Sequence, residues 1–93
     1  MNNKNRNDAR EWWALVDELR ESNLAHVDKV LRAFNFATDQ LIAHGQHEIE
    51  LSRAMKDQES VIRGQIKTET LKYSQKTLRD CYILFVGRDY DDE

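Results

Sequence analysis

The clearest hydrophobic pattern in the chain lies between residues 24 and 41, where seam positions recur three and four residues apart. The seam consists of Leu24, Val27, Leu31, Phe34, Thr38 and Leu41. This spacing is typical of a helix with one buried stripe sustained over about five turns. The stripe is broader than that of a two-stranded coiled coil, because it is widened by Val30, Ala33, Ala37 and Ile42. We therefore expect a helix over residues 23–44 that packs in a bundle.

A shorter amphipathic pattern comes before this seam. Asp8 stands three residues before Glu11, the spacing at which the two side chains cap the backbone N–H groups of an opening helical turn. One helical face then carries Trp12, Leu15, Val16 and Leu19. The sequence predicts a helix over residues 8–21, preceded by a flexible polar tail at residues 1–7.

Gly45 allows two interpretations. Directly after His44, it suits the left-handed cap of a helix C-terminus, which favours a hairpin turn there. The alternative is a helix that continues through Gly45, because glycine costs only about 1 kcal/mol inside a helix. We favour the turn and expect a third helix over residues 46–85. Its thin apolar stripe consists of Ile49, Met55, Ile62 and Ile66.

Two segments near the end of the chain are ambiguous. Residues 68–77 hold four threonines or serines, and the apolar stripe changes phase across them, which predicts a kink. Residues 81–87 are rich in aromatic and β-branched side chains, so a buried strand is an alternative to a helix there. Residues 87–93 are predicted to form an acidic tail.

Composition supports an all-α fold. The 93 residues include no proline and three glycines, so the chain lacks the turn residues that sheets and barrels need. We expect one helical domain over residues 8–86, a helical hairpin or three-helix unit that assembles into an oligomeric bundle. The single cysteine and the lack of a charged-then-apolar leader favour a cytoplasmic protein. The longest apolar run, residues 81–86, is too short for a membrane span.

Charge is distributed unevenly, although the net charge is only −3. Residues 8–50 carry nine acidic and four basic side chains, whereas residues 51–79 carry three acidic and seven basic ones. Such blocks favour the pairing of oppositely charged helices, within the fold or across an oligomer. The alternative is a basic face that binds a partner.

The candidates for chemistry are few. His44, His47 and Glu48 share one side of a continuous helix, a spacing that could hold a divalent metal. Gly45 interrupts this motif, so we interpret the histidines as capping or solvated residues and expect no metal or cofactor. Cys81 lies in an apolar run, where a free thiol behaves as a small hydrophobic group rather than a nucleophile. We expect no enzymatic activity.

Five basic side chains form the candidate nucleic-acid site. Two stripes on the third helix could meet a phosphate backbone, one with Lys72, Lys76 and Arg79 and the other with Arg63 and Lys67. The isoelectric point of about 5.6 is low for a nucleic-acid-binding protein, so a solvated face or ion pairing is favoured.

Aromatic side chains supply the candidate partner site. Trp13 lies at the edge of the first helix's apolar face, and Phe36 points away from the main seam, beside Lys29 and Arg32. Phe36 needs a cover, either from another helix of the chain or from a partner. These features predict a non-enzymatic interaction protein, such as an adaptor, regulator or inhibitor. We expect it to self-associate, most simply as a homodimer, and to bind another macromolecule, in the first place a protein.

Overall fold

The chain folds into three α-helices in the computed structural model, which describes residues 3–89 and the side chains from residue 9 onward. The helices are α1 (Asn3–Glu21), α2 (His26–Ala54) and α3 (Gln58–Val86). The prediction of an all-α fold is confirmed. No described helix combines the length and the apolar character that crossing a membrane requires.

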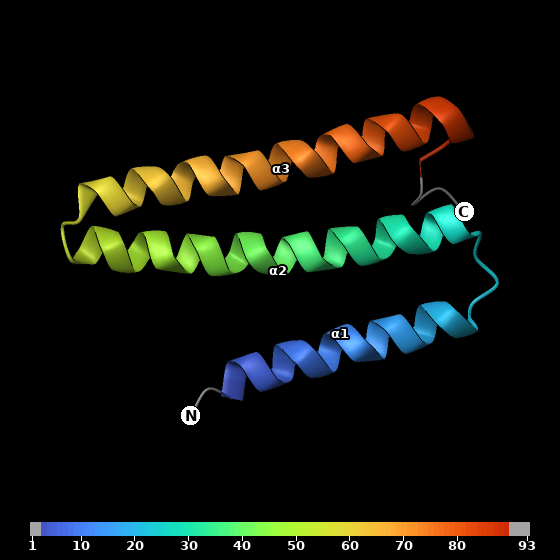
Figure 1. The fold of residues 1–93 in the computed structure, drawn as a ribbon, viewed down its shortest axis with the longest axis horizontal. Coiled ribbons are helices and arrows are strands. Elements are labelled where there is room, and N and C mark those ends of the chain that lie inside the picture. Colours follow the sequence, from blue (N-terminus) through green and yellow to red (C-terminus); the bar gives the residue numbers. More distant parts are fainter. Residues whose placement is uncertain (1–2, 90–93) are drawn as a thin grey trace.

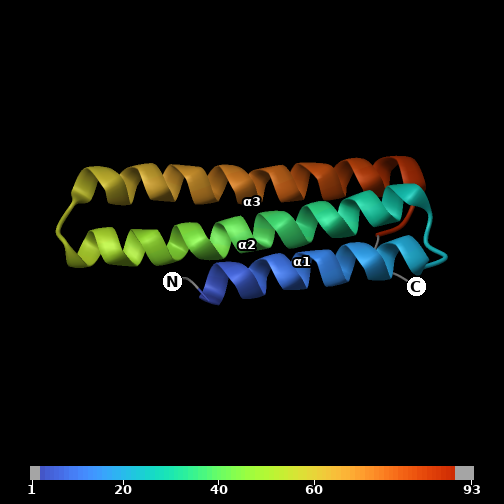
Figure 2. The same cartoon turned by 60° about the horizontal axis from the view of Figure 1, so that its bottom comes forward.

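The three helices lie side by side in one layer (Figures 1 and 2). α2 and α3 form a long antiparallel hairpin, and α1 runs along the other side of α2, beside its N-terminal half. The Cα atoms extend over 48 × 33 × 15 Å. Because an α-helix with its side chains is about 10 Å across, the shortest dimension leaves room for a single layer. Both broad faces of α2 and α3 are therefore left open within the described chain.

The turn between α2 and α3 lies at residues 55–57, and the turn predicted at Gly45 is wrong. Lys56 adopts a left-handed conformation with φ of 59°. Asp57 caps α3, because its carboxylate accepts hydrogen bonds from the backbone N–H of Ser60 at 3.2 Å and from the Ser60 hydroxyl at 2.7 Å. α2 passes through Gly45 without a break.

Gly45 allows α2 and α3 to pack closely and does not form a turn. A Cβ atom there would meet Cγ2 of Thr68 at 2.8 Å, and a Cβ atom at Gly64 would meet Cγ1 of Ile49 at 2.6 Å. Any side chain at these positions would push α2 and α3 apart. The two glycines thus set the distance between the helices.

Other predicted boundaries also change. α1 begins at Asn3, so the cap predicted at Asp8 is wrong. α3 continues without a break through residues 68–77, and residues 81–86 are helical, so the strand alternative is wrong. Gly87 ends α3 in a left-handed cap with φ of 87°. Residues 3–7 belong to α1, the flexibility predicted for residues 1–7 stays a prediction, and residues 1–2 and 90–93 lie outside the described residues.

The threonines and serines of α3 fit the helix because they bond to its own backbone. The hydroxyls of Thr68, Thr70 and Ser74 each donate to the carbonyl oxygen four residues earlier. The distances are 3.1, 2.8 and 3.0 Å, respectively. These side chains therefore need no break in the helix to be satisfied.

The core is narrow and follows seven-residue spacing. On α2, Leu31, Thr38 and Gly45 are buried toward α3, together with Ile42 and Ile49. On α3, Thr68 and Tyr82 are buried, and Gln75 lies between them in the same row. The thin apolar stripe predicted on one helix is divided between two, because Ile49 is buried on α2, whereas Ile62 and Ile66 lie on α3 and are more than half exposed. Ile66 lies on the side of α3 opposite this row, and Ile62 lies about 120° from it.

We expect Gly64→Ala to lower the free energy of unfolding by up to about 2 kcal/mol, measured by urea denaturation. Alanine gains about 1 kcal/mol in helix propensity, but overpacking against Ile49 costs about 1–3 kcal/mol. Gly64→Val should lower it further.

Two controls separate packing from propensity. Gln46→Ala, at an exposed position of α2, should change stability by no more than about 0.5 kcal/mol. In an Ile49→Ala background, which removes the Cγ1 atom, Gly64→Ala should cost little. Equal loss in both backgrounds would contradict this account of the helix contact.

Candidate interaction face

The two sides of α2 differ in polarity on either side of its buried row. A helix turns by about 100° per residue, so the positions three and four residues after a buried residue fall on opposite sides of it. Phe34 follows Leu31 by three residues, and Asn35 follows it by four. Val27 and Leu41 lie seven residues before and after Phe34, so they share its side. One side of α2 is thus apolar, and the other begins with polar Asn35.

α3 likewise has one apolar side and one polar side next to its buried row. The positions three residues after Thr68, Gln75 and Tyr82 are occupied by Leu71, Leu78 and Phe85. The positions four residues after Thr68 and Gln75 are occupied by Lys72 and Arg79. Because the helices are antiparallel, the apolar side of α3 and the apolar side of α2 lie on the same face of the layer.

Contacts between α2 and α3 fix how the two apolar rows align. Gln75 Nε2 donates to Thr38 Oγ1 at 2.6 Å, and counting outward from this pair along the antiparallel helices sets Phe34 within one residue, about 1.5 Å, of the level of Leu78. The same count sets Leu41 within one residue of the level of Leu71, and Val27 within one residue of the level of Phe85. Successive pairs are seven residues apart, or about 10.5 Å along the helix. The face therefore carries three apolar layers.

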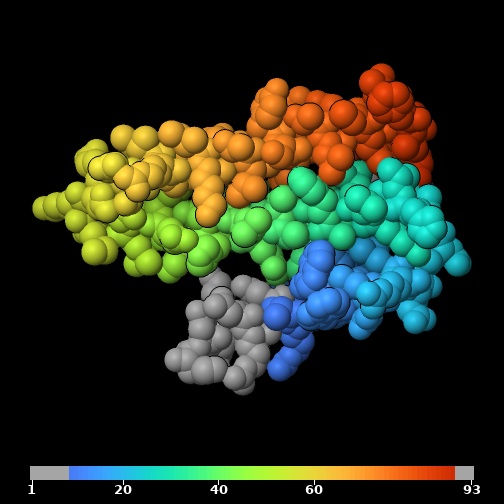
Figure 3. Space-filling view, in the orientation of Figure 1, coloured from blue at the N-terminus to red at the C-terminus, as the bar shows by residue number. Residues whose placement is uncertain are grey.

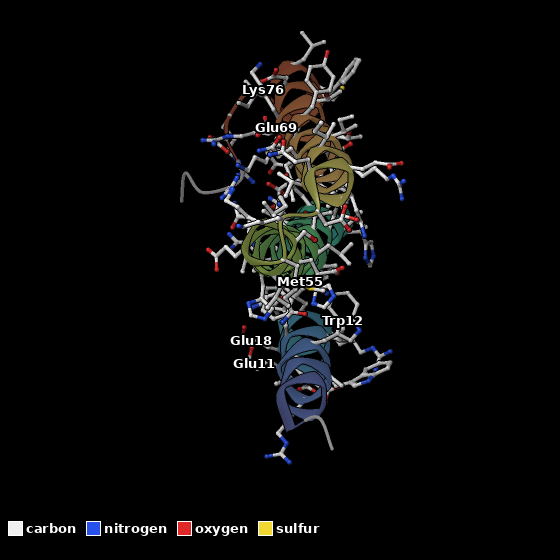
Figure 4. All side chains as sticks on the ribbon, turned by 90° about the vertical axis from the view of Figure 1, so that its left-hand side faces the viewer. Glu11, Trp12, Glu18, Met55, Glu69 and Lys76 are labelled. Carbon is white, nitrogen blue, oxygen red and sulfur yellow. The ribbon has the colours of Figure 1, made fainter. Side chains whose placement is uncertain are left out.

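α1 adds a tryptophan to this face. Trp12 packs on Phe36 of α2, with 6.2 Å between ring centroids. Glu11 and Trp13 flank Trp12, about 100° to either side. Figure 4 shows Glu11 and Glu18 on the same side of the layer as Lys76, so Trp13 lies on the other side. We call this side the apolar face and define it by Trp13, Val27, Val30, Phe34, Leu41, Leu71, Leu78 and Phe85.

Large side chains on the apolar face are open to solvent. The exposed fraction is 83% for Phe85, 64% for Val30 and 56% for Trp13. Phe34, Leu71 and Leu78 are half-buried. Figure 3 presents this face of the layer to the reader, with the three helices lying next to one another. An exposed apolar surface of this kind marks an interaction site in soluble proteins.

The apolar face ends in a shallow hollow toward the α2–α3 turn. Gly45, Ile49 and Gly64 form its floor, and its rim includes Glu48, Arg63 and Lys67. Glu48 continues the α2 row of Val27, Phe34 and Leu41 by one more step of seven residues. Gly64 likewise continues the α3 row. Charge thus replaces apolar surface at this end of the face.

The opposite face is polar and internally bonded. Gln75 also donates to Asp39 Oδ1 at 2.8 Å, and Lys72, Lys76 and Arg79 line the same shallow hollow as Asn35 and Asp39. The hydrogen bonds of Gln75 thus join α3 to α2 on the polar face.

A buried carboxylate ties the C-terminal end of α3 to the start of α2. Asp28 accepts a hydrogen bond from the Tyr82 hydroxyl, and Arg88 lies 3.1 Å from its other oxygen. The Tyr82 hydrogen bond and the Arg88 guanidinium lower the pKa of Asp28, whereas burial and the neighbouring carboxylate raise the pKa of Tyr82. Sequence reasoning missed this cluster. The sequence signal for the cluster was that Asp28 falls in a row of seven-residue spacing that continues through Asn35, Ile42 and Ile49.

The predicted partner residues do not all come together. Trp13 lies on the apolar face, but Phe36 is half-buried against Trp12, so α1 supplies the cover that Phe36 needs. Arg32 is half-buried and lines a hollow between α1 and α2 with Phe36 and Asp39, and Lys29 is half-buried. A role in partner binding stays a prediction for each of Trp13, Phe36, Lys29 and Arg32.

Most of the predicted nucleic-acid residues are engaged with acidic side chains. Lys76 lies 2.8 Å from Asp80 and Lys72 lies 3.7 Å from Glu69. The remaining pairs are Arg63 with Glu59 and Arg79 with Asp89. Lys67 borders the hollow on the other face of the layer. The basic stripe is therefore locally neutralised, which weakens its attraction for phosphate.

The histidine motif does not form a ligand cluster. His44 and Glu48 pair at 2.8 Å between Nε2 and Oε1, and His47 is exposed. Within the part of the chain that the structure describes, no three His, Cys, Asp or Glu side chains converge to hold a metal ion. Comparisons with protein-family models, with curated proteins and with solved structures find no match to this chain.

Acid should destabilise the protein partly through Asp28. Because the folded-state pKa of Asp28 is lowered, its contribution is present above the unfolded pKa and is lost as the pH falls through the folded pKa. We expect the free energy of unfolding of wild type to fall below about pH 4. Asp28→Asn should be less stable at neutral pH and should lose less stability over this acidic range.

The matched control is Asp17→Asn, which removes an exposed carboxylate of α1. Urea denaturation at several pH values should give Asp17→Asn the same acid dependence as wild type. An Asp28→Asn curve parallel to that of wild type would contradict the role assigned to the Asp28 cluster.

Proposed function

We propose that this chain is a non-enzymatic helical interaction protein that acts by docking its apolar face on another protein molecule. In this role it would serve as an adaptor, regulator or inhibitor in the cytoplasm. The observation that carries the proposal is the segregation of the layer into one apolar face and one polar face. A chain that used its helices only to fold would not need to place Phe85, Val30 and Trp13 in water.

The spacing of the apolar face supports a protein as the partner. Its rows on α2 and α3 recur every seven residues, the period at which side chains of one helix fit between those of another. A partner that presents helices could therefore engage all three apolar layers at once. Aromatic side chains such as Trp13 and Phe85 are the types that most often anchor protein interfaces.

We expect Val30→Asp to abolish partner binding while the helical fold survives. Val30 is mostly exposed in the isolated chain, so a charge there costs little before binding, whereas it would be desolvated in a complex. The measurement is affinity capture from the native host by wild-type and variant baits, followed by mass spectrometry.

Gln46→Asp is the matched control, because it adds the same charge at an exposed position on the other side of α2. A protein retained by wild type and Gln46→Asp, and lost with Val30→Asp, would support the proposal. Retention by all three baits would place binding elsewhere and contradict it. Circular dichroism should give equal helicity for the three proteins.

A further inference from the structure

We infer that the first partner of the apolar face is a second copy of this chain. Two copies meet face to face about a two-fold axis parallel to the helices, so that α2 of each lies on α3 of the other. This inference rests on the proposed function and names the molecule that covers the face. The result is a four-helix core of two hairpins, in place of two single layers that each expose one apolar side.

The hairpin is large enough for this contact. Each of α2 and α3 has 29 residues, which makes the hairpin about 43 Å long and about 20 Å wide. Its projected area of roughly 850 Å² matches the roughly 800 Å² per partner that a stable interface buries.

The apolar row on α2 of each copy then lies opposite the apolar row on α3 of the other, and the two rows have the same seven-residue spacing. Phe34 lies on Leu78 of the partner, Leu41 on the partner's Leu71 and Val27 on the partner's Phe85. The two-fold axis repeats each contact, as a closed dimer requires. All three apolar layers are covered by apolar side chains.

Charge complementarity selects this direction of packing. The same register sets Glu48 on Gly64 of the partner, where a carboxylate has space. Arg63 and Lys67 border that position on the hollow's rim. Each Glu48 thus meets two basic side chains of the partner, and this contact occurs twice.

A two-fold axis across the helices gives a poorer match. If it passed through the middle of the hairpin, it would set the apolar half of each face on the charged half of the partner. If it passed through the Phe34 layer, the charged hollow would extend beyond the partner without a contact. Neither arrangement uses Glu48 together with Lys67.

The parallel axis also covers exposed residues outside the hairpin face. The outer side of α3, away from α2, carries Ile66, Tyr73 and Leu84, all more than half exposed. In the dimer, α1 of one copy runs beside this outer side of the partner's α3. Trp13 then lies between the levels of the partner's Tyr73 and Leu84. The second apolar stripe of α3 thereby gains a cover for part of its length.

A lipid surface fits less well than a second copy. Peripheral helices that bind membranes combine an apolar face with excess basic charge. This chain has a net charge of −3, and the rim of the face includes Glu48. The apolar rows also have the spacing of helix packing, which a lipid surface does not require.

Light scattering across micromolar concentrations tests the inference directly. Wild type and Gln46→Asp should have the mass of two chains, and Val30→Asp should raise the dimer dissociation constant at least about tenfold. A wild-type protein that stays monomeric overturns the inference. So does a dimer that Val30→Asp leaves unchanged.

Disulfide trapping tests the direction of packing. Val30 lies within two residues, about 3 Å, of the level of Cys81, and both point out of the apolar face, so Val30→Cys should cross-link to Cys81 of the partner under mild oxidation. Within one chain these side chains project side by side from neighbouring helices, too far apart for a disulfide. Ser74→Cys is the control, because it would meet the partner's Cys81 only with the axis across the helices.

The expected result is a covalent dimer with Val30→Cys and none with wild type or Ser74→Cys on non-reducing gels. Efficient cross-linking of Ser74→Cys instead would overturn the parallel axis. The face would be assigned to lipid if a monomeric chain floats with anionic lipid vesicles and Val30→Asp abolishes this binding. That outcome would overturn the inference of a second copy. A monomeric chain that still captures a host protein through Val30 would overturn this inference and leave the proposed function standing.

Discussion

The close approach of α2 and α3 at Gly45 and Gly64 is the constraint on which the rest of the layer depends. With hydrogen atoms at these positions, Thr68 and Ile49 fill the space between the helices. The buried row is therefore narrow and holds small or polar side chains such as Thr38 beside Leu31. Large apolar residues three positions away from this row have no space between the helices, so they lie on the open face.

A hairpin built this way is incompletely buried as a single layer. The buried apolar side chains of the described chain are Leu19, Leu31, Ile42, Ile49 and Tyr82. This is a small core for a domain of this length, in which the cost of ordering the chain is nearly as large as the gain from burial. Domains normally pack two layers of secondary structure around a core. A cover on the apolar face would supply the second layer.

Periodicity predicted the helices well and their contacts less well. The seam positions from Val27 to Leu41 do lie on one helix, whereas Leu24 precedes it, and the seam merges a row buried against α3 with a row exposed to solvent. A shift of three residues along a helix changes direction by only about 60°, so a single sequence does not separate the two rows. Gly45 was misassigned because glycine suits both a cap and a close contact, and only the position of α3 decides between them. Trp13 and Phe36 looked alike as unpartnered aromatics, yet the packing of Trp12 on Phe36 leaves only Trp13 on the open face.

Polar and small residues, rather than large apolar ones, fix how α3 is placed on α2. The Gln75–Thr38 hydrogen bond and the Asp28 cluster with Tyr82 each join one position of α2 to one position of α3. A slip by one helical turn would break both and would set a side chain against Gly64. Apolar contacts tolerate such a slip far better, because their attraction has little directionality. The specificity of the hairpin therefore comes from its polar row, which leaves the apolar rows available to a partner without any change in the fold of the chain.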